Sequence, residues 1–403
     1  MKIGVWLSSD YSTEVGGGFS YYNRLIHGLD TYPFDDPIEL CFITEKRDCA
    51  NLSHPVIELH YEYRETRRES IQKHIPLFRG RTRRQIKLRN ELERQRSFVK
   101  TLQNAGVKLI YYLIQAQSEL LDFPFVATNW DIGHRSSWVF PEMMSDSSFD
   151  GREWVYNQML PRALMIICES QAGKEELVRY THINPNRIRI ARLFAGEVSL
   201  CEVSMEKQNE ILNSFHLVRE QYFYYPAQFW AHKNHYTLLK AYSCFSKSHP
   251  ECRLVFSGSD KGTLSHIRTV CHGLELDEKV VFAGFVPIET VSTLYKNAIA
   301  LVMPTLLGPT NMPLLEAMEL GCPVICSDFP GHREELSDSA IYVNPLDEKE
   351  IIMAMEKMIA QHDEYSRLIK ERSKECPFKM ELALDSINYH LLEAINLRNC
   401  WGE

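Results

Sequence analysis

A repeated unit constrains the fold of this chain more than any other feature of its sequence: a short apolar run leads through a polar loop into a helix. The unit is clearest in residues 299–326, where the run IALVM is followed by the loop TLLGPTN, a short helix, a turn at Gly321 and the run PVIC. Short β-rich runs that alternate with helices predict a parallel sheet covered by helices on both faces. We therefore expect an α/β fold.

Comparable runs divide the chain into two parts. In the first part, strands are expected at residues 2–7, 38–44, 109–112, 125–129, 165–168 and 187–194. In the second part, strands are expected at residues 222–226, 253–257, 279–282, 299–303, 323–326 and 340–343, with helices at 235–247, 264–273, 288–297 and 348–361. Two doubly wound domains in tandem leave a cleft between the carboxyl ends of their strands, where such sheets bind ligands.

The domain boundaries follow from these patterns. We expect an N-terminal domain in residues 1–200, a C-terminal domain in residues 215–376, and a polar linker near residues 201–213. Residues 377–403 contain an amphipathic helical pattern, which we expect to pack back on the N-terminal domain.

Composition and cysteine content exclude several classes of protein. Of the 403 residues, 44% are hydrophobic and 24% are charged, as in soluble globular proteins. No apolar run is long enough for a transmembrane helix, and Met1 and Lys2 lead into a strand rather than a secretory signal, so we expect a cytoplasmic protein. Most of the 11 cysteines lie in apolar surroundings, and no Cys/His pairs have zinc-ligand spacing, so we expect free thiols and no metal site.

The charge is unevenly distributed. Between Arg64 and Lys100, thirteen Lys and Arg residues accompany four Glu residues, which gives this segment a net charge of +9, whereas the remainder of the chain carries −17. Apolar residues recur at helical spacing among the charges. This pattern is typical of a basic amphipathic helix that lies on an anionic membrane surface, or of a solvated helix paired with acidic residues elsewhere in the fold. Nucleic-acid binding is not expected, because no aromatic or base-reading motif accompanies the charge.

Two glycine-containing loops have the composition of ligand-binding loops. Gly308 has no side chain, so the backbone N–H groups around it can approach phosphate or sugar hydroxyls at the start of a helix, and Glu316 can accept hydrogen bonds from a hydroxylated ligand. An ordinary strand-to-helix connection is the alternative. Near the N-terminus, Gly17 and Gly18 belong to a triple glycine before a helix, which is not the spaced GxGxxG of dinucleotide folds. This segment either places amides near a phosphate or is a plain loop.

Lys233 lies in the segment YPAQFWAHKNHYTLLKAY, just after an expected strand and at the start of a helix. A cation there faces the same cleft as the Gly308 loop and can neutralise a diphosphate. The competing interpretation is a solvent-facing lysine at a helix start.

Three segments together resemble the retaining GT-B glycosyltransferases of family four: FYYPAQFWAHKNH, GFVPIETVSTLYKNAIALVMPTLLGPTNMPLLEAMELGCPVICSDFPGHREEL and TNWDIGHRSSWVFPE. The resemblance is strong over residues 221–375 and looser in the N-terminal half. It implies the GT-B fold, with two Rossmann-like domains facing each other across a cleft. It also implies an acceptor-binding N-terminal domain and a donor-binding C-terminal domain.

The resemblance assigns roles to residues of the C-terminal half. The family has two glutamates separated by seven residues. The second matches Glu316, which is implied to hold the donor ribose, whereas the first falls at Gly308, so that backbone amides and Asn311 are expected to replace its contacts with the sugar. Lys233 matches the diphosphate-binding lysine, and Gln228 occupies the position of a phosphate-binding arginine. The expected donor-binding residues are Gly17, Gly18, Gln228, Lys233, Gly308, Thr310, Asn311, Met312 and Glu316.

In the N-terminal half, Asp131 and His134 belong to WDIGH, which is similar to the family's His-Asp-Leu segment. Either residue is a candidate to orient or deprotonate an acceptor hydroxyl, and with Lys233 they are the expected catalytic residues. For Asp131, a core-capping role is the alternative. Glu142 belongs to the same block, and Ser170 is either a cleft residue or a helix N-cap.

The resemblance implies a metal-independent hexosyltransferase that acts on a GDP- or UDP-sugar, with mannose as the expected sugar. The expected acceptor is a glycan or lipid-linked glycan of a bacterial surface polysaccharide such as lipopolysaccharide, reached by peripheral contact with the inner face of the membrane. No cofactor is expected. A nucleotide-sugar 2-epimerase and a catalytically silent sugar-nucleotide-binding subunit remain as alternatives.

Overall fold

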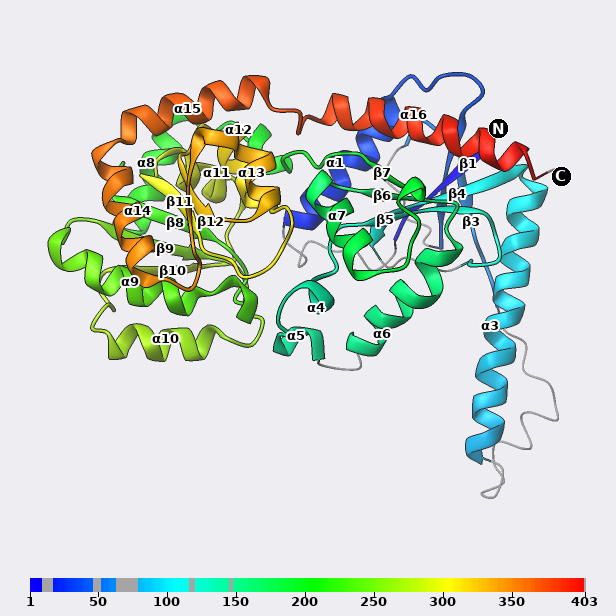
Figure 1. Ribbon diagram of the computed structural model, residues 1–403, viewed down its shortest axis with the longest axis horizontal. Coiled ribbons are helices and arrows are strands. Elements are labelled where there is room, and N and C mark those ends of the chain that lie inside the picture. The colour runs from blue at the N-terminus through cyan, green and yellow to red at the C-terminus, as the bar shows by residue number, and fades with distance from the viewer. Residues whose placement is uncertain (9–16, 46–51, 63–78, 116–119, 145–147, 402–403) are drawn as a thin grey trace.

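Two parallel sheets form the cores of two domains in the computed structural model, which describes residues 1–403 except 9–16, 46–51, 63–78, 116–119, 145–147 and 402–403 (Figure 1). Among the described residues, the N-terminal sheet has seven strands and the C-terminal sheet has six. This arrangement confirms the predicted fold class.

The N-terminal sheet has the strand order β3-β2-β1-β4-β5-β6-β7, and every pairing in it is parallel. Its strands are β1 (Lys2–Trp6), β2 (Glu39–Thr44), β3 (Val56–Glu58), β4 (Val107–Gln115), β5 (Phe125–Asn129), β6 (Met165–Cys168) and β7 (Ile188–Ile190). The helices are α1 (Gly17–Thr31), α3 (Arg79–Asn104), α4 (Gly133–Ser136), α5 (Pro141–Met144), α6 (Ser148–Trp154) and α7 (Gln171–Tyr180). The strand order reverses direction between β1 and β4, which is where doubly wound sheets bind ligands.

The C-terminal sheet has the order β10-β9-β8-β11-β12-β13, also with parallel pairings. Its strands are β8 (Tyr222–Pro226), β9 (Arg253–Ser257), β10 (Val280–Gly284), β11 (Ala300–Met303), β12 (Val324–Ser327) and β13 (Ala340–Val343). The helices are α8 (Met205–Ser214), α9 (His235–Ser248), α10 (Leu264–Gly273), α11 (Ile288–Lys296), α12 (Met312–Glu319), α13 (Pro330–Leu336), α14 (Glu348–Ala360) and α15 (His362–Glu375). Here the order reverses between β8 and β11, the strands that precede Lys233 and Gly308.

Three local differences separate the sequence expectations from the structure. The linker expected near residues 201–213 contains most of α8, which packs against α11 of the C-terminal domain. The strand expected at 187–194 is limited to β7, because residues 191–194 continue as irregular chain toward the linker. Strand β3 was not expected. It is a short edge strand with exposed residues at both ends, so it lacks a buried apolar run.

The chain returns to the N-terminal domain through α16 (Met380–Asn399), which lies along α1 (Figure 1). Asn388 donates a 2.6 Å hydrogen bond to Asp35 and accepts one of 3.1 Å from the Asp35 backbone N–H. Arg189 at the end of the N-terminal sheet pairs with Glu393. The final helix therefore ties the C-terminal domain to the N-terminal one at a second crossing point.

Helix α3 projects from the body of the N-terminal domain, as the cyan helix in Figure 1 shows. Phe98 is buried where the helix joins the domain, whereas Leu88 and Leu92 are exposed further along it. Arg94 pairs with Glu91 and with Glu45 of the domain. Among the described residues, no helix combines the length and the apolar character needed to cross a membrane.

Candidate active site

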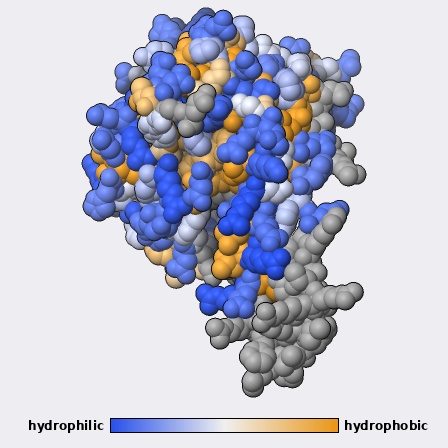
Figure 2. All heavy atoms as spheres, turned by 90° about the vertical axis from the view of Figure 1, so that its right-hand side faces the viewer, coloured by the Kyte–Doolittle hydropathy of each residue, from blue (hydrophilic) through white to orange (hydrophobic). Residues whose placement is uncertain are grey.

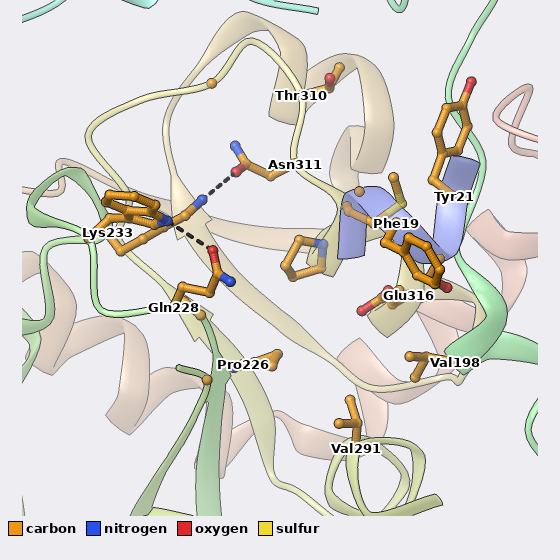
Figure 3. Close-up of a pocket in the computed structure, with 18 of the residues that line it drawn as sticks. Phe19, Tyr21, Val198, Pro226, Gln228, Lys233, Val291, Thr310, Asn311 and Glu316 are labelled. Atoms are coloured by element: carbon orange, nitrogen blue, oxygen red, sulfur yellow. Dashed lines mark hydrogen bonds between the residues drawn. The ribbon is translucent and has the colours of Figure 1, made fainter. Parts of the chain in front are cut away.

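A cavity of about 560 Å³ lies between the two domains, at the carboxyl ends of β8 and β11 (Figure 3). The N-terminal domain contributes residues from α1 and from the loop after β5. The chain around Val198 that passes from the first domain to the second, here called the crossing segment, also lines the cavity. The C-terminal domain contributes the loops after β8, β10 and β11. Nine of the predicted site residues line the cavity: Gly18, Asp131, Gln228, Lys233, Gly308, Thr310, Asn311, Met312 and Glu316. Gly17 is the first residue of α1, adjacent to Gly18.

Lys233 ends a short turn whose geometry is fixed by the next residue. Asn234 adopts the left-handed conformation at φ 58°, and its side-chain amide donates to the carbonyl groups of Pro304 and Pro345 at 2.9 and 2.7 Å. The hydroxyl of Tyr225 donates to the Lys233 carbonyl at 2.9 Å. These contacts attach the turn to the neighbouring loops of the same domain. The backbone from which the Lys233 side chain extends is therefore fixed in position.

The ammonium group of Lys233 points toward Asn311 and donates a 3.1 Å hydrogen bond to its Oδ1 atom (Figure 3). Desolvation by burial lowers the pKa of Lys233 to about 8, against the attraction of the Glu142 and Asp131 carboxylates. Among the described lining residues, Lys233 is the single Lys or Arg side chain. Gln228 instead donates to Ser259 at 3.1 Å and accepts from the Trp230 indole at 2.9 Å.

The conformation of the loop after β11 depends on two glycines, one in the loop and one in α13, which packs against it. Gly308 has φ +113°, a region that side chains rarely adopt, and a Cβ atom there would lie 2.6 Å from Asn311 Nδ2 and 3.0 Å from the Thr310 carbonyl. A Cβ atom on Gly331 of α13 would lie 1.4 Å from the Pro309 carbonyl oxygen, so α13 packs directly against the loop backbone. The backbone conformation at Gly308 therefore disfavours the acid that the family pattern places there.

Glu316 lies on α12, on the opposite side of the cavity from Lys233 (Figure 3). It is only 4% exposed, and Tyr295 donates a 3.1 Å hydrogen bond to its Oε2 atom. Its Oε1 atom has no hydrogen-bond partner among the described residues. Burial raises the pKa of Glu316 to about 7 despite the Tyr295 hydrogen bond. One carboxylate oxygen is thus held by the protein and the other can accept a hydrogen bond from a ligand hydroxyl.

Asp131 and His134 occupy different environments, although they are three residues apart. Asp131 lines the cavity, and its Oδ1 atom accepts a 2.9 Å hydrogen bond from the N–H of Gly133, two residues further on, as in an Asx-turn; the N-cap of α4 is Ile132. His134 is 3% exposed, lies between the rings of Phe149 and Tyr156, and pairs with Glu153 at 2.9 Å.

His134 does not line the cavity, so its predicted role at the acceptor hydroxyl is not supported by this geometry. The physical reason is that the single turn α4 directs the side chain of its second residue into the domain core. Desolvation by that core lowers the pKa of His134.

Two residues near the site were assigned no role in it from the sequence. Glu142 of α5 accepts hydrogen bonds from the backbone N–H and the ring of His232, next to Lys233, so it connects the N-terminal domain to the lysine turn. Gly196 of the crossing segment lies so close to Glu316 that a Cβ atom on it would be 3.2 Å from Oε1. Neither contact has a local sequence signal.

Of the two roles considered for Ser170, the structure shows the helix cap: Ser170 is the N-cap of α7 and its Oγ atom accepts from the Gly173 N–H at 2.9 Å.

The described residues contain no group of three His, Cys, Asp or Glu side chains arranged to bind a metal ion. The described cavity lining instead includes one lysine, the carboxyl groups of Asp131, Glu197 and Glu316, and the backbone of a glycine-containing loop. This combination suits an anionic ligand that also carries hydroxyl groups.

Comparison with known proteins agrees with this geometry. Residues 207–375 match the family described as glycosyl transferases group 1. The C-terminal domain belongs to the group 1 glycosyl transferases. The O-antigen chain mannosyltransferase RfbU of Salmonella typhimurium is 34% identical over 149 residues, which cover 37% of this chain and 41% of that protein. The chain thus spans less than half of the length of this relative.

Solved structures resemble the chain over almost its full length. Sucrose-phosphate synthase from Thermosynechococcus elongatus superposes with a TM-score of 0.68 at 19% identity, covering 98% of this chain and 99% of that one. Alr3699/HepE of Anabaena, in complex with UDP and glucose, superposes with a TM-score of 0.66 at 16% identity, with coverage of 98% and 99%. The fold is GT-B.

The backbone at Gly308 generates a first prediction. In Gly308→Glu, the glutamate backbone must keep a positive φ, which costs roughly 1–3 kcal/mol in folding free energy. Its side chain also displaces Asn311. We expect a lower melting temperature and weaker binding of GDP and UDP, although the substitution restores the acid of the family pattern. Gly273→Glu is the matched control, because a Cβ atom there meets nothing within 4 Å. Equal stability of the two variants, or tighter nucleotide binding by Gly308→Glu, would contradict this account.

The raised pKa of Glu316 leads to a second prediction, about the pH dependence of stability. Its pKa is raised from 4.5 to about 7 in the folded state, so the folded protein binds the proton more tightly and loses stability as the pH rises through this window. Glu316→Gln removes this dependence and keeps an acceptor for Tyr295. Without ligand, the unfolding free energy of the variant relative to wild type should increase by up to about 3 kcal/mol between pH 5 and pH 8 in urea titrations. A constant difference would show that the carboxyl pKa is not raised.

Proposed function

We propose that the protein is a retaining glycosyltransferase that moves a hexose from a nucleotide diphosphate sugar to a glycan or lipid-linked acceptor in bacterial surface polysaccharide synthesis. The observation that carries the proposal is the shared cavity, in which Lys233 and the half-satisfied carboxyl group of Glu316 face the same space from opposite sides. A nucleotide diphosphate sugar offers a matching pair of groups, since its diphosphate is anionic and its ribose carries a diol.

The diphosphate and the ribose of the donor each have a partner in this arrangement. The diphosphate lies at the Lys233 ammonium and the backbone amides near Gly308 and Thr310, where the charge of the leaving group develops. The ribose hydroxyls donate to Oε1 of Glu316. The sugar is bonded to the other end of the diphosphate from the ribose, so it extends away from Glu316, toward the part of the cavity that Asp131 of the N-terminal domain lines.

The reaction needs no enzymatic nucleophile. The bond between the anomeric carbon and the diphosphate oxygen breaks, and the acceptor oxygen attacks the same face through an oxocarbenium-like state. The proton of the acceptor hydroxyl passes to the departing diphosphate. The protein contributes positioning and charge stabilisation, with Lys233 as the main electrostatic group and Asp131 as the candidate to orient the acceptor hydroxyl.

Mannose is the sugar that we favour, with GDP-mannose as the first donor to test. The support is the loop sequence GPTN together with the matched relative RfbU, which is named an O-antigen chain mannosyltransferase. The Anabaena protein bound to UDP and glucose makes UDP-sugars the second group to test.

A donor panel combined with a lysine substitution tests the proposal. With an acceptor glycan, release of nucleoside diphosphate from GDP-mannose, UDP-glucose or UDP-N-acetylglucosamine should fall by about 10²- to 10³-fold in kcat/KM in Lys233→Ala, because one transition-state donor is removed. Lys240→Ala is the matched control, since Lys240 lies on α9 outside the cavity lining and pairs with Glu348 of α14. Product with an inverted anomeric centre would exclude retention, isomerised free sugar would indicate an epimerase, and binding without turnover would indicate a silent subunit.

We also propose that α3 brings the enzyme to an anionic membrane surface. The described part of the helix exposes Leu88 and Leu92 among basic residues, and Figure 2 shows apolar atoms between hydrophilic ones on the face of the molecule that carries α3. An amphipathic basic helix binds such surfaces through buried apolar area and attraction to anionic lipids. Its projection from the domain leaves this surface accessible (Figure 1).

Sedimentation with vesicles tests this second proposal. The protein should bind vesicles that contain phosphatidylglycerol and not vesicles of phosphatidylcholine alone, and binding should weaken with salt because it is partly electrostatic. Replacing Leu88 and Leu92 together by Ser should weaken binding about tenfold. Leu382→Ser is the control, since Leu382 is an exposed leucine of α16. Unchanged binding of the double variant would exclude α3 as the contact.

A further inference from the structure

Every polar group of Asn311 is engaged by a neighbouring residue. Its Oδ1 atom accepts from Lys233 Nζ at 3.1 Å, its Nδ2 atom contacts His332 Nε2 at 2.9 Å, and its backbone N–H donates to Glu335 Oε1 at 3.3 Å. Asn311 is 7% exposed, and His332 and Glu335 are fully buried. Asn311 is thus held on three sides, and its amide is committed to Lys233 rather than free to reach a sugar.

The orientation of this amide is determined by His332. The Nδ1 atom of His332 lies 2.8 Å from the carbonyl oxygen of Ser327, which can only accept, so Nδ1 carries the proton. Burial lowers the pKa of His332 to about 4, which keeps the ring neutral. Its Nε2 atom therefore has a lone pair and accepts a hydrogen bond, which only the NH₂ group of the Asn311 amide can donate. The carbonyl side of the amide must then face Lys233.

Burial disfavours charge on the groups around Asn311. Asn311 carries no charge, burial lowers the pKa of His332, and burial raises the pKa of Glu335 well above its ordinary value. The acid of the family pattern is absent, because Gly308 occupies its position. Among the described residues, the acceptor that holds Lys233 on this side of the cavity is an uncharged amide, whereas the carboxylates that attract the lysine are those of Glu142 and Asp131.

We propose that His332 is a positioning residue for donor binding: it fixes the Asn311 carboxamide so that Lys233 is held in place by a neutral acceptor and keeps its full charge for the diphosphate. The inference rests on the proposed role of Lys233. It explains how a cavity with one lining Lys or Arg among the described residues can bind a diphosphate: the group that orients this cation adds no further negative charge to those of Glu142 and Asp131. A carboxylate at position 311 would orient Lys233 equally well but would cancel its charge and repel the ligand.

Binding of GDP and of UDP, measured by titration calorimetry, tests the inference. Lys233→Met should lower the affinity by about 10- to 100-fold, as expected for a lost charge-assisted hydrogen bond. His332→Leu should lower it by about fivefold, and Asn311→Asp should lower it by about tenfold or more. His332→Gln should restore part of the loss, because its carboxamide can donate to Ser327 and accept from Asn311.

A double-variant cycle separates positioning from a general structural role. If His332 acts through Asn311 on Lys233, His332→Leu should have no further effect in the Lys233→Met background. Leu336→Ala is the matched control, because Leu336 is fully buried on the same helix and its loss destabilises the domain without touching Asn311. This control should leave the affinity of the folded protein unchanged.

The pH dependence of binding gives an independent measurement. Lys233 is charged below its pKa, so wild-type affinity should fall as the pH rises through about 8. The fall should move to lower pH in His332→Leu, where Lys233 loses its fixed acceptor, and to higher pH in Asn311→Asp, where it gains a counter-charge. The other groups that face Lys233 are Asp131, Glu142, His232, His235 and His332.

Each outcome is decisive. Full affinity in Lys233→Met would overturn the proposed donor site itself. Weak binding in Lys233→Met together with wild-type affinity in His332→Leu would overturn the positioning role alone. Equal effects of His332→Leu in both backgrounds, or no shift in its pH dependence, would show that His332 only stabilises the domain.

Discussion

The hydrogen bond between Lys233 and Asn311 joins the two loops on which the site depends. One loop follows β8 and the other follows β11, the strands at which the order of the C-terminal sheet reverses. Loops on either side of such a reversal diverge and leave a crevice. Near the strands the Leu306 N–H donates to the His232 carbonyl at 2.8 Å, and the Lys233–Asn311 contact joins the two loops through side chains. Glycine at positions 308 and 331 permits the close packing that brings Asn311 to the lysine. The remaining lining residues then complete a cavity whose charged end is already fixed.

Polar contacts also join the N-terminal domain to the C-terminal domain near this site. Glu142 holds the backbone and ring of His232, Ser137 donates to the Leu306 carbonyl at 3.1 Å, and the carboxylate of Glu334 accepts from the first N–H groups of α7 at 3.1 Å. An anionic group at a helix N-terminus is favourable, because the unpaired N–H groups there carry partial positive charge. The two domains are therefore joined by polar contacts beside the cavity. They are also connected by the chain itself, which passes back from the C-terminal domain into α16. Polar interfaces of this kind are compatible with domain movement around a bound ligand.

Much of the fold follows from local patterns. The strands at 125–129, 165–168, 222–226, 253–257 and 340–343 coincide with their predicted bounds, because each is a continuous apolar run between turn residues. Strand β3 and helix α8 were not predicted, since one is a half-exposed edge and the other has a mostly polar sequence. The cavity lining could be predicted for Lys233, Gly308 and Glu316, because they follow strands at the same edge of one sheet. The direction of the His134 side chain could not, because it depends on how a single helical turn packs on the domain.

The sequence by itself determined the two doubly wound sheets, the glycine-containing loop and the identity of the residues at the strand ends. These properties depend on periodicity and on the conformational range of individual residues, which act over a few positions along the chain. Only the tertiary structure decided that the Asn311 amide faces Lys233, that one Glu316 oxygen has no partner in the described part of the chain, and that Glu142 accepts from His232 of the other domain. Each of these depends on residues distant in the chain being desolvated together, because burial determines which polar atoms must find partners and which remain available to a ligand.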